Sequence, residues 1–278
     1  MRVVYFILMQ RLGDVSKHSE GWPSLLCYVF FLFLGGNQMD TIKVNKGNVK
    51  MVAHRGVSGL ELENTNAAFV VAGNRTYYGI ETDVHVTKDE QIAVFHDDNL
   101  KRVAGVDMVV EESTLAELQS IPLFDGKVPG QFRTDLRIPI LADYIGICKK
   151  YGKKAVLELK NQMEPKHITQ IVNIIKEQEY LDGVIFISFS WENCVELRKQ
   201  LPEQKIQFLI STFPDALIQR LVDAKLDLDI HFKALTAENV KALHEAGIEV
   251  NCWTVDQPEE AEKLIGYGVD YITSNILE

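Results

Sequence analysis

The stretch Gly79-Ile80-Glu81-Thr82-Asp83-Val84-His85-Val86 places two acidic residues, spaced two apart, inside a run of β-type residues. Successive side chains on a strand point to opposite faces, so Glu81 and Asp83 project together while Ile80, Thr82 and Val84 face the opposite layer. His85 shares the face of the acidic pair. An acidic pair of this kind is also common on a solvated surface strand, so its meaning depends on the segments around it.

Outward from this strand, short β-type runs alternate with helical patterns from Val49 to the C-terminus. Repeated β-then-α units of roughly 20 to 30 residues predict a parallel sheet. A chain of 278 residues can fill one α/β barrel, which takes about 250 residues. We therefore expect a single-domain TIM (β/α)8 barrel over residues 49–278. The strands predicted besides Gly79–Val86 are Val49–Ala53, Ile92–Phe95, Lys154–Lys160, Val184–Phe189, Ile206–Ser211, Leu228–Phe232, Ile248–Thr254 and Val269–Thr273.

Nine predicted strands are one more than a barrel needs. Lys88-Asp89-Glu90 reads as a turn, so Ile92–Phe95 is expected to fold back on the preceding strand as a hairpin arm. Between Arg102 and Pro139 the pattern degrades and prolines and glycines cluster, which predicts a short excursion across the barrel mouth.

Helix signals lie between most of the strands. Asn64-Thr65 is expected to cap the first helix, and an amphipathic pattern predicts a helix from Ile168 to Glu179. Gly247 and Gly268 follow helical runs, where a C-cap glycine belongs. Later helices are expected to begin near Trp191, Pro214, Thr236 and Pro258.

Residues 1–48 form an atypical N-terminal extension outside the predicted fold. The apolar run Leu25–Leu34 is too short to span a bilayer, which needs about 20 residues. Three interpretations compete: a degenerate export or anchor segment, a real extension packed on the domain, or an upstream start codon with translation beginning at Met39. The last is preferred and implies a cytoplasmic protein; a real signal or anchor would imply export or membrane association.

The composition restricts the kinds of partner that the protein is expected to bind. The net charge is −10 and no Lys/Arg cluster stands out, so nucleic-acid binding is not expected. An acidic protein that binds an anion needs local positive charge, which a bound metal can supply. The cysteines form no CxxC pair, so reduced, buried thiols are expected at Cys27, Cys148, Cys194 and Cys252.

Four polar constellations fall at the ends of predicted strands, where barrel enzymes place catalytic groups. Glu158 and Lys160 share a strand face with Val156, whereas Leu157 and Leu159 turn outward to the helices. Three carboxylates aimed into a barrel repel one another unless a hard divalent cation neutralises them, and Mg²⁺ or Ca²⁺ suits oxygen ligands. Taken singly, a histidine after a strand is more often structural, and Glu158–Lys160 fits a plain ion pair. The constellations are His54-Arg55-Gly56, Glu81-Thr82-Asp83, Phe95-His96-Asp97 and Leu157-Glu158-Leu159-Lys160.

These motifs, in this order, resemble the glycerophosphodiester phosphodiesterase family, and the resemblance covers about Val49 to the C-terminus. Further matches are Glu63-Asn64-Thr65, Cys252-Trp253-Thr254-Val255 and Gly268-Val269-Asp270-Tyr271-Ile272-Thr273. The resemblance implies metal-dependent hydrolysis of glycerophosphodiesters to glycerol 3-phosphate and an alcohol. It implies that His54 and His96 form an acid/base pair and that Glu81, Asp83 and Glu158 are metal ligands. Arg55 and Lys160 are then expected to hold the phosphate, and Trp253 to form an aromatic wall beside the substrate.

The same chemistry follows from the residue types. A cation and Arg55 would neutralise a phosphodiester, one histidine would take a proton from the attacking hydroxyl, and the other would protonate the departing alkoxide. Several positions are expected to matter less: Ser274-Asn275 as rim, where the family often has an aspartate after the threonine, His85 as a supporting residue, and Glu63-Asn64 as helix caps.

Two rival functions remain. One is a lysophospholipid-directed phosphodiesterase of the same barrel type, and the other a non-catalytic barrel that binds phosphorylated ligands. A small-molecule diester without firm membrane association is the preferred partner, and the oligomeric state stays open.

Overall fold

The computed structural model describes residues 40–125 and 128–278. The expectations for the apolar runs, for Cys27 and for translation from Met39 concern residues outside these ranges. Residues just before the predicted boundary at residue 49 pack on the barrel. The backbone N–H of Ile42 donates to the carbonyl of Ile276 at 3.0 Å, and Ile42 forms a parallel bridge with Leu277.

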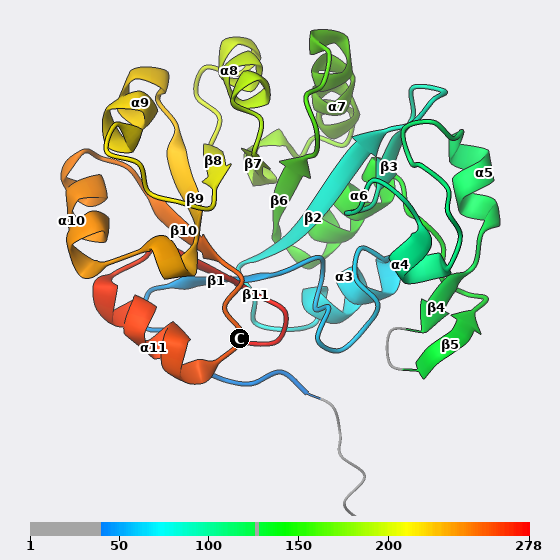
Figure 1. Ribbon diagram of the computed structural model, residues 1–278, viewed down its shortest axis with the longest axis horizontal. Helices are drawn as coiled ribbons and strands as arrows, with labels where there is room; N and C mark the ends of the chain where they lie inside the picture. Colours follow the sequence, from blue (N-terminus) through cyan, green and yellow to red (C-terminus); the bar gives the residue numbers. More distant parts are fainter. Residues whose placement is uncertain (1–39, 126–127) are drawn as a thin grey trace, which may run out of the picture. The chain divides into compact units, whose positions relative to one another are not determined.

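Eight parallel strands close into a barrel, which confirms the predicted TIM fold (Figure 1). Each barrel strand pairs with its neighbours in the ring, and β1 pairs with both β2 and β11, so the eight strands form a closed ring. The barrel strands are β1 (Lys50–Ala53), β2 (Gly79–Val86), β6 (Lys154–Leu159), β7 (Val184–Ser188), β8 (Ile206–Ile210), β9 (Asp227–His231), β10 (Val250–Trp253) and β11 (Tyr271–Ser274).

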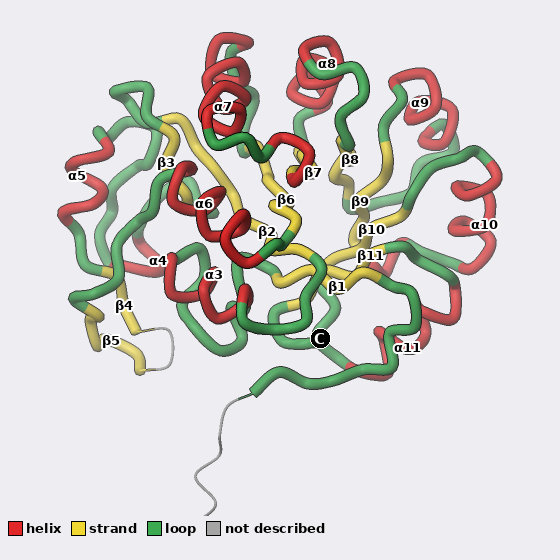
Figure 2. Tube along the Cα trace, turned by 180° about the vertical axis from the view of Figure 1, so that it is seen from behind, coloured by secondary structure: helices red, strands yellow, loops and turns green. Residues whose placement is uncertain are grey.

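Helices surround the strands, as Figures 1 and 2 show from opposite sides. The prolines at residues 165 and 258 occupy first-turn positions, and Thr236 caps α10 by accepting from the N–H of Asn239. Gly268 ends α11 with φ of 89°, as expected for a left-handed C-cap. The helices are α3 (Asn66–Gly73), α4 (Lys101–Ala104), α5 (Leu115–Ser120), α6 (Leu141–Tyr151), α7 (Pro165–Glu177), α8 (Trp191–Gln200), α9 (Leu217–Ala224), α10 (Ala237–Glu245) and α11 (Pro258–Tyr267), with 3-10 turns at Leu181–Gly183 and Phe232–Ala234.

The extra strand β3 (Ile92–Val94) pairs antiparallel with β2, so the predicted hairpin arm is confirmed. The region after it contains more regular structure than predicted. Strands β4 (Leu123–Asp125) and β5 (Val128–Arg133) form a second hairpin outside the barrel sheet. Residues of this region, including Leu100, Leu118 and Leu136, bury a small core of their own.

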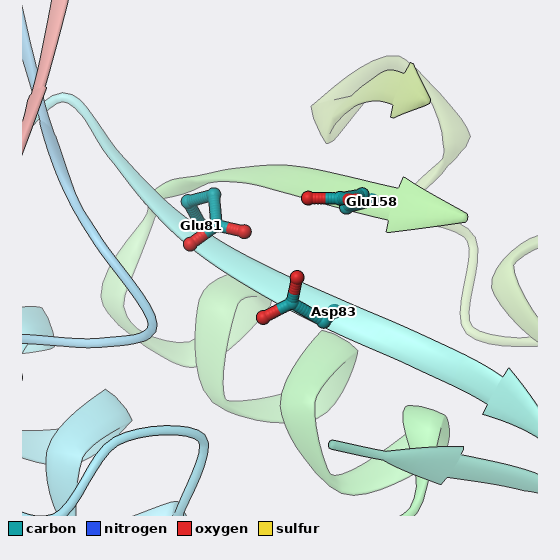
Figure 3. A group of neighbouring side chains, drawn as sticks. All are labelled: Glu81, Asp83 and Glu158. Carbon is teal, nitrogen blue, oxygen red and sulfur yellow. The ribbon is translucent and has the colours of Figure 1, made fainter. Parts of the chain in front are cut away.

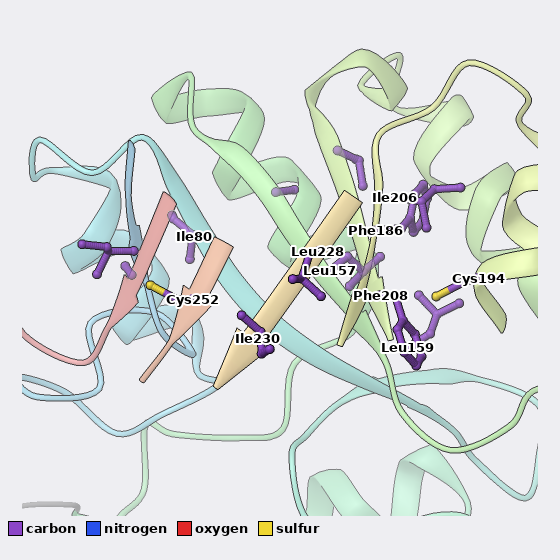
Figure 4. Packing of buried hydrophobic residues seen from close by; sticks show 14 of the residues in the cluster. Ile80, Leu157, Leu159, Phe186, Cys194, Ile206, Phe208, Leu228, Ile230 and Cys252 are labelled. Carbon is purple, nitrogen blue, oxygen red and sulfur yellow. The ribbon is translucent and has the colours of Figure 1, made fainter. Parts of the chain in front are cut away.

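Two apolar layers hold the barrel. Inside it, Val156, Ile187 and Leu209 belong to a small interior cluster. Outside it, a larger layer between strands and helices contains Leu157 and Leu159, which confirms their predicted orientation (Figure 4). Fully burying one such side chain stabilises a fold by about 1.5–3 kcal/mol, so this outer layer supplies most of the packing.

The helix predictions differ from the structure at three places. The helix predicted from Ile168 to Glu179 runs instead from Pro165 to Glu177. The helix expected from Pro214 begins instead at Leu217, because Pro214 lies in a separate turn whose carbonyl accepts from the N–H of Leu217. Helix α6 was not predicted. The expected buried thiols are found at Cys148, Cys194 and Cys252. Among the described residues, no helix combines the length and hydropathy that crossing a bilayer requires.

Candidate active site

The strand register of β2 and β6 assembles three carboxylates. Asp83 pairs with Glu158 across the two parallel strands, and Glu81 lies two residues before Asp83 on the same face. Each of the three offers an oxygen within 4.8 Å of the others, and the side chains point toward one another in Figure 3. Their residues are 3%, 1% and 7% exposed, so water does little to screen the mutual repulsion.

The ionisation of the three carboxyls reflects this crowding. Burial and the charge of Asp83 raise the pKa of Glu81 well above its usual value, and the same two causes raise the pKa of Glu158 to about 8. Burial acts against ionisation of Asp83 too, but the charges of Lys160 and Arg55 outweigh it and lower its pKa.

A divalent cation fits this set of donors. Lys160 Nζ lies 2.9 Å from Glu158 Oε1 and 3.6 Å from Asp83 Oδ1, and Arg55 Nε lies 3.7 Å from Asp83 Oδ2. These two cations do not satisfy the site, because the buried Asp83 Oδ1 accepts no hydrogen bond among the described residues. Clustered carboxylate oxygens with spare lone pairs are the ligands that hard cations prefer.

His54 follows β1, and Asn275 fixes its orientation. Asn275 Nδ2 donates to Asp256 Oδ2 at 2.6 Å, so its Oδ1 faces His54 Nδ1 at 2.7 Å and accepts from it. His54 Nε2 therefore carries the lone pair, 4.0 Å from Glu81 Oε2. Burial and the charge of Arg55 lower the pKa of His54 to about 4. Asn275 thus holds a site histidine, and the expectation that it is only rim is wrong.

His96 follows β3, which the hairpin brings beside β2. Its Nδ1 donates to Asp97 Oδ1 at 2.6 Å, Nε2 has no hydrogen-bond partner among the described residues, and the backbone carbonyl of His96 lies 3.3 Å from His85 Nε2. Burial lowers the pKa of His96, although the charge of Asp83 and the bond to Asp97 act in the opposite direction. His85 also bonds Glu111, so it supports the loop of His96 as a structural residue, as expected.

One arginine connects the two histidine motifs, and no sequence pattern indicated it. Arg102 donates to Asp97 Oδ2 and to Glu63 Oε2, each at 2.7 Å, and Glu63 in turn accepts from Arg55 Nη1 at 2.8 Å. Glu63 therefore belongs to the charge network of the site. The expectation that it caps a helix is wrong.

The expectation for Asn64 is also wrong, because Thr65 caps α3. The Thr65 hydroxyl accepts from the N–H of Ala68 at 3.2 Å. Asn64 instead donates to Asp83 Oδ2 at 2.8 Å and accepts from the Thr82 hydroxyl at 2.7 Å. It thereby fixes one oxygen of Asp83 and leaves the other open.

A pocket of about 430 Å³, open to solvent, collects most of the predicted residues. Lys160 lies next to it through its ion pair with Glu158, and Asp83 through its register pairing with Glu158 and its ion pair with Lys160. Trp253 forms part of the wall and meets Phe189 edge to face, with ring centroids 5.6 Å apart. Asp229 also lines the pocket and was not predicted. The lining residues are His54, Arg55, Glu81, His96, Glu158, Ile187, Phe189, Leu209, Asp229, Trp253, Thr254 and Thr273.

A closed barrel with acidic, basic and imidazole groups gathered in one pocket defines a class, the TIM-barrel enzymes. Residues 54–277 match the glycerophosphoryl diester phosphodiesterase family. A glycerophosphodiester phosphodiesterase of Caldanaerobacter subterraneus is 29% identical over 231 residues, covering 81% of this chain and 93% of that protein. The chain therefore belongs to the glycerophosphoryl diester phosphodiesterase family, and it is an enzyme of that kind.

Two further similarities bear on the substrate. The solved structure of an Oleispira antarctica phosphodiesterase in complex with the product sn-glycerol-3-phosphate superposes with a TM-score of 0.75 and 28% identity, covering 84% of this chain and 96% of that one. The human lysophospholipase D GDPD1 is 34% identical over 130 residues, covering 44% of this chain and 40% of that protein.

Proposed function

We propose that this enzyme hydrolyses glycerophosphodiesters to glycerol 3-phosphate and an alcohol, with Mg²⁺ or Ca²⁺ held by Glu81, Asp83 and Glu158. The observation that carries the proposal is the convergence of this carboxylate cluster with two imidazoles on one pocket. When bound, the cation neutralises the phosphodiester and stabilises charge on its oxygens.

The two basic residues are proposed to hold the phosphoryl group. Arg55 lines the pocket, and its buried Nε has no hydrogen-bond partner among the described residues, so one donor remains for a phosphate oxygen. Lys160 sits against Glu158 and Asp83 and acts as a point charge beneath the phosphate.

The hydrogen-bond partners of the two histidines support one of them as the general base and the other as the general acid. His54 bonds a neutral amide and presents a lone pair on Nε2, which suits a general base. His96 bonds the carboxylate of Asp97, which favours the imidazolium and suits a general acid. In the proposed reaction His54 takes the proton of the glycerol hydroxyl next to the phosphoester, and that oxygen attacks phosphorus. His96 then protonates the leaving alkoxide. Water next attacks phosphorus of the cyclic phosphate, with His96 taking its proton, and the bond to the oxygen that attacked first breaks while His54 returns a proton to that oxygen.

The test is hydrolysis of glycerophosphocholine with Mg²⁺ or Ca²⁺, with and without a chelator. His54→Ala and His96→Ala should each lower kcat by about 10²–10⁴-fold with unchanged circular dichroism. His244→Ala is the matched control, because His244 pairs with Asp270 outside the pocket. Near-wild-type turnover by either site variant would remove that histidine from the mechanism.

A second candidate is a phosphodiesterase directed at lysophospholipids. Phe189 is 46% exposed beside Trp253 at the pocket, so an apolar group of a substrate would find a surface there. Faster metal-stimulated turnover of lysophosphatidylcholine than of glycerophosphocholine would favour this candidate. Binding of either diester without metal-stimulated turnover would instead favour a non-catalytic barrel.

A further inference from the structure

Asp229 is a buried carboxyl that the proposed mechanism does not use. It lies on β9 inside the barrel, is 2% exposed, and lines the pocket. Its Oδ1 is buried and has no hydrogen-bond partner among the described residues. Buried polar groups in native proteins are almost always paired, so an unpaired carboxyl oxygen facing a pocket points to a partner that arrives with the ligand.

Three polar residues on the strands near Asp229 form hydrogen bonds with one another and not with Asp229. Asn251, its register partner on β10, donates to Gln207 Oε1 at 3.1 Å. Asn251 in turn accepts from the Thr273 hydroxyl at 3.2 Å. Neither of these bonds involves Asp229, so its Oδ1 remains available to the pocket. Gln207 Nε2 is likewise buried without a hydrogen-bond partner among the described residues, but Gln207 does not line the pocket.

An unpaired donor lies on the adjacent strand. Trp253 follows Asn251 by two residues on β10, so its side chain projects to the same side of the strand as that of Asn251. Its Nε1 is buried without an acceptor among the described residues, and its ring lines the same pocket. The pocket therefore contains one buried acceptor and one buried donor that do not bond each other.

The chemistry of these two groups selects their ligand. An ionised Asp229 would repel a phosphate oxygen, and Asp229 is not among the carboxylates that cluster for a cation. Ile187 and Leu209 supply apolar walls to the pocket. A hydroxyl donates to a carboxylate, accepts from a carboxylic acid, and accepts from an indole N–H, so it satisfies these groups whatever the protonation of Asp229.

We propose that Asp229 and the indole N–H of Trp253 form a hydroxyl-binding subsite that recognises the terminal hydroxyl of the glycerol group. This inference rests on the proposed function and assigns substrate specificity to a residue pair outside the acid/base and metal machinery. The terminal hydroxyl is the one that does not attack phosphorus, so the subsite selects glycerol over shorter or deoxygenated groups.

The experiment compares glycerophosphocholine with the phosphocholine ester of propane-1,2-diol, which keeps the attacking hydroxyl and lacks the terminal one. The wild-type enzyme should prefer glycerophosphocholine in kcat/KM by about tenfold or more, the scale of one buried hydrogen bond. Asp229→Ala should abolish this preference by lowering kcat/KM for glycerophosphocholine alone. Asp229→Asn, which preserves volume and hydrogen-bonding capacity, should retain part of it.

Two further variants sharpen the result. Trp253→Phe keeps the ring, removes the N–H and should also weaken the preference. Asp223→Ala, on the outer helix α9, should leave it unchanged. An equal loss for both substrates in Asp229→Ala and Asp229→Asn would overturn the proposal and make Asp229 a structural residue. Weaker Mg²⁺ binding by Asp229→Asn in calorimetry would overturn it by assigning Asp229 to the cation site.

Failure of the proposed function would look different. If the wild-type enzyme turned over neither diester, calorimetry with glycerol 3-phosphate and with propane-1,2-diol 1-phosphate would still test the subsite. Tighter binding of glycerol 3-phosphate by wild type but not by Asp229→Ala would support the subsite without catalysis. Equal affinities of the wild type for both ligands would overturn it.

Discussion

The two site histidines are each held through Nδ1, but their partners differ in charge. Asn275 is neutral and is itself fixed by Asp256, whereas Asp97 is an anion that also accepts from Arg102. Hydrogen bonds from Arg102 and His96 outweigh partial burial and lower the pKa of Asp97 to about 2, so Asp97 stays ionised throughout the neutral range. The two histidines therefore differ in the charge next to Nδ1, which is neutral at His54 and negative at His96.

That asymmetry predicts a shift in the pH profile of Asp97→Asn. A carboxylate stabilises the imidazolium of His96, so removing its charge should lower the pKa of His96 further. A general acid with a lower pKa loses its proton at lower pH, so the alkaline limb of kcat/KM should move to lower pH. Steady-state kinetics from pH 5 to 9 measures this shift.

Asp98→Asn serves as the control, because Asp98 follows directly in the chain but bonds Asn161 instead of His96. Its profile should coincide with that of the wild-type enzyme. An unshifted alkaline limb in Asp97→Asn would show that His96 is not the acid that this limb reports.

At the scale of elements, the turn between β1 and α3 leaves very little space near the site for an added side-chain atom. Gly56 has φ of 77°, and a Cβ added there would lie 2.6 Å from the Cβ of Ala68 on α3. Its N–H donates to the carbonyl of Glu81 at 3.1 Å, so the same residue ties this turn to β2. Glycine at this position allows helix α3 to pack directly against the turn that carries His54 and Arg55.

Gly56→Ala should therefore destabilise the protein by about 1–3 kcal/mol, from left-handed strain together with the clash. Because the turn carries site residues, kcat should fall as well. Thermal unfolding measures the first effect and turnover the second. Gly266→Ala is the matched control: Gly266 lies inside α11 with open space around its Cα, so alanine should stabilise by about 0.5–1 kcal/mol. Equal melting temperatures for the two variants would contradict this account.

The sequence predicts those elements whose patterns are local. Strand β2 matches its predicted bounds because the alternation in Gly79–Val86 is set by neighbouring residues. Helix α6 has the spacing of an amphipathic helix, with Leu141, Tyr144, Ile145 and Cys148 buried, but it lies between the excursion predicted to end at Pro139 and the strand predicted from Lys154, where no helix is predicted. The β4–β5 hairpin was missed because Pro129-Gly130 interrupts its strand pattern.

The site residues also divide into those that local sequence patterns predict and those that they do not. His54, Glu81, His96 and Glu158 stand in motifs on or directly after predicted strands, so the barrel topology together with the β2–β3 hairpin brings them to one pocket. Other site residues depend on long-range contacts that no local spacing reveals. Arg102 reaches Glu63 across 39 positions, and Asn275 reaches His54 across 221. Asp229 alternates with leucine and isoleucine, as it would on a solvated strand, and only closure of the barrel buries it.

For the whole molecule, the carboxylate cluster couples cation binding to stability. Without a cation, the raised pKa values of Glu81 and Glu158 mean that these two groups bind more protons in the folded protein than in the unfolded chain between about pH 4.5 and 8. Their contribution to folding stability should therefore fall as pH rises through this window, whereas the lowered pKa values of His54 and His96 act in the opposite direction at its acidic end. A divalent cation reverses the effect, because it favours the ionised carboxylates and displaces their protons.

We therefore expect Mg²⁺ or Ca²⁺ to raise the melting temperature more at pH 8 than at pH 6. At a free concentration of one hundred times Kd, the cation should add about 2.7 kcal/mol, which is several degrees for a chain of this size. Differential scanning calorimetry at both pH values, with and without chelator, measures the increment.

In Glu158→Gln the cation-dependent increment in melting temperature should shrink sharply, because the variant loses a charged ligand. In Glu192→Gln, a substitution on the outer helix α8, the wild-type increment should persist. A rise in melting temperature that is independent of pH, or that persists in Glu158→Gln, would show that the cation does not bind at the carboxylate cluster on β2 and β6.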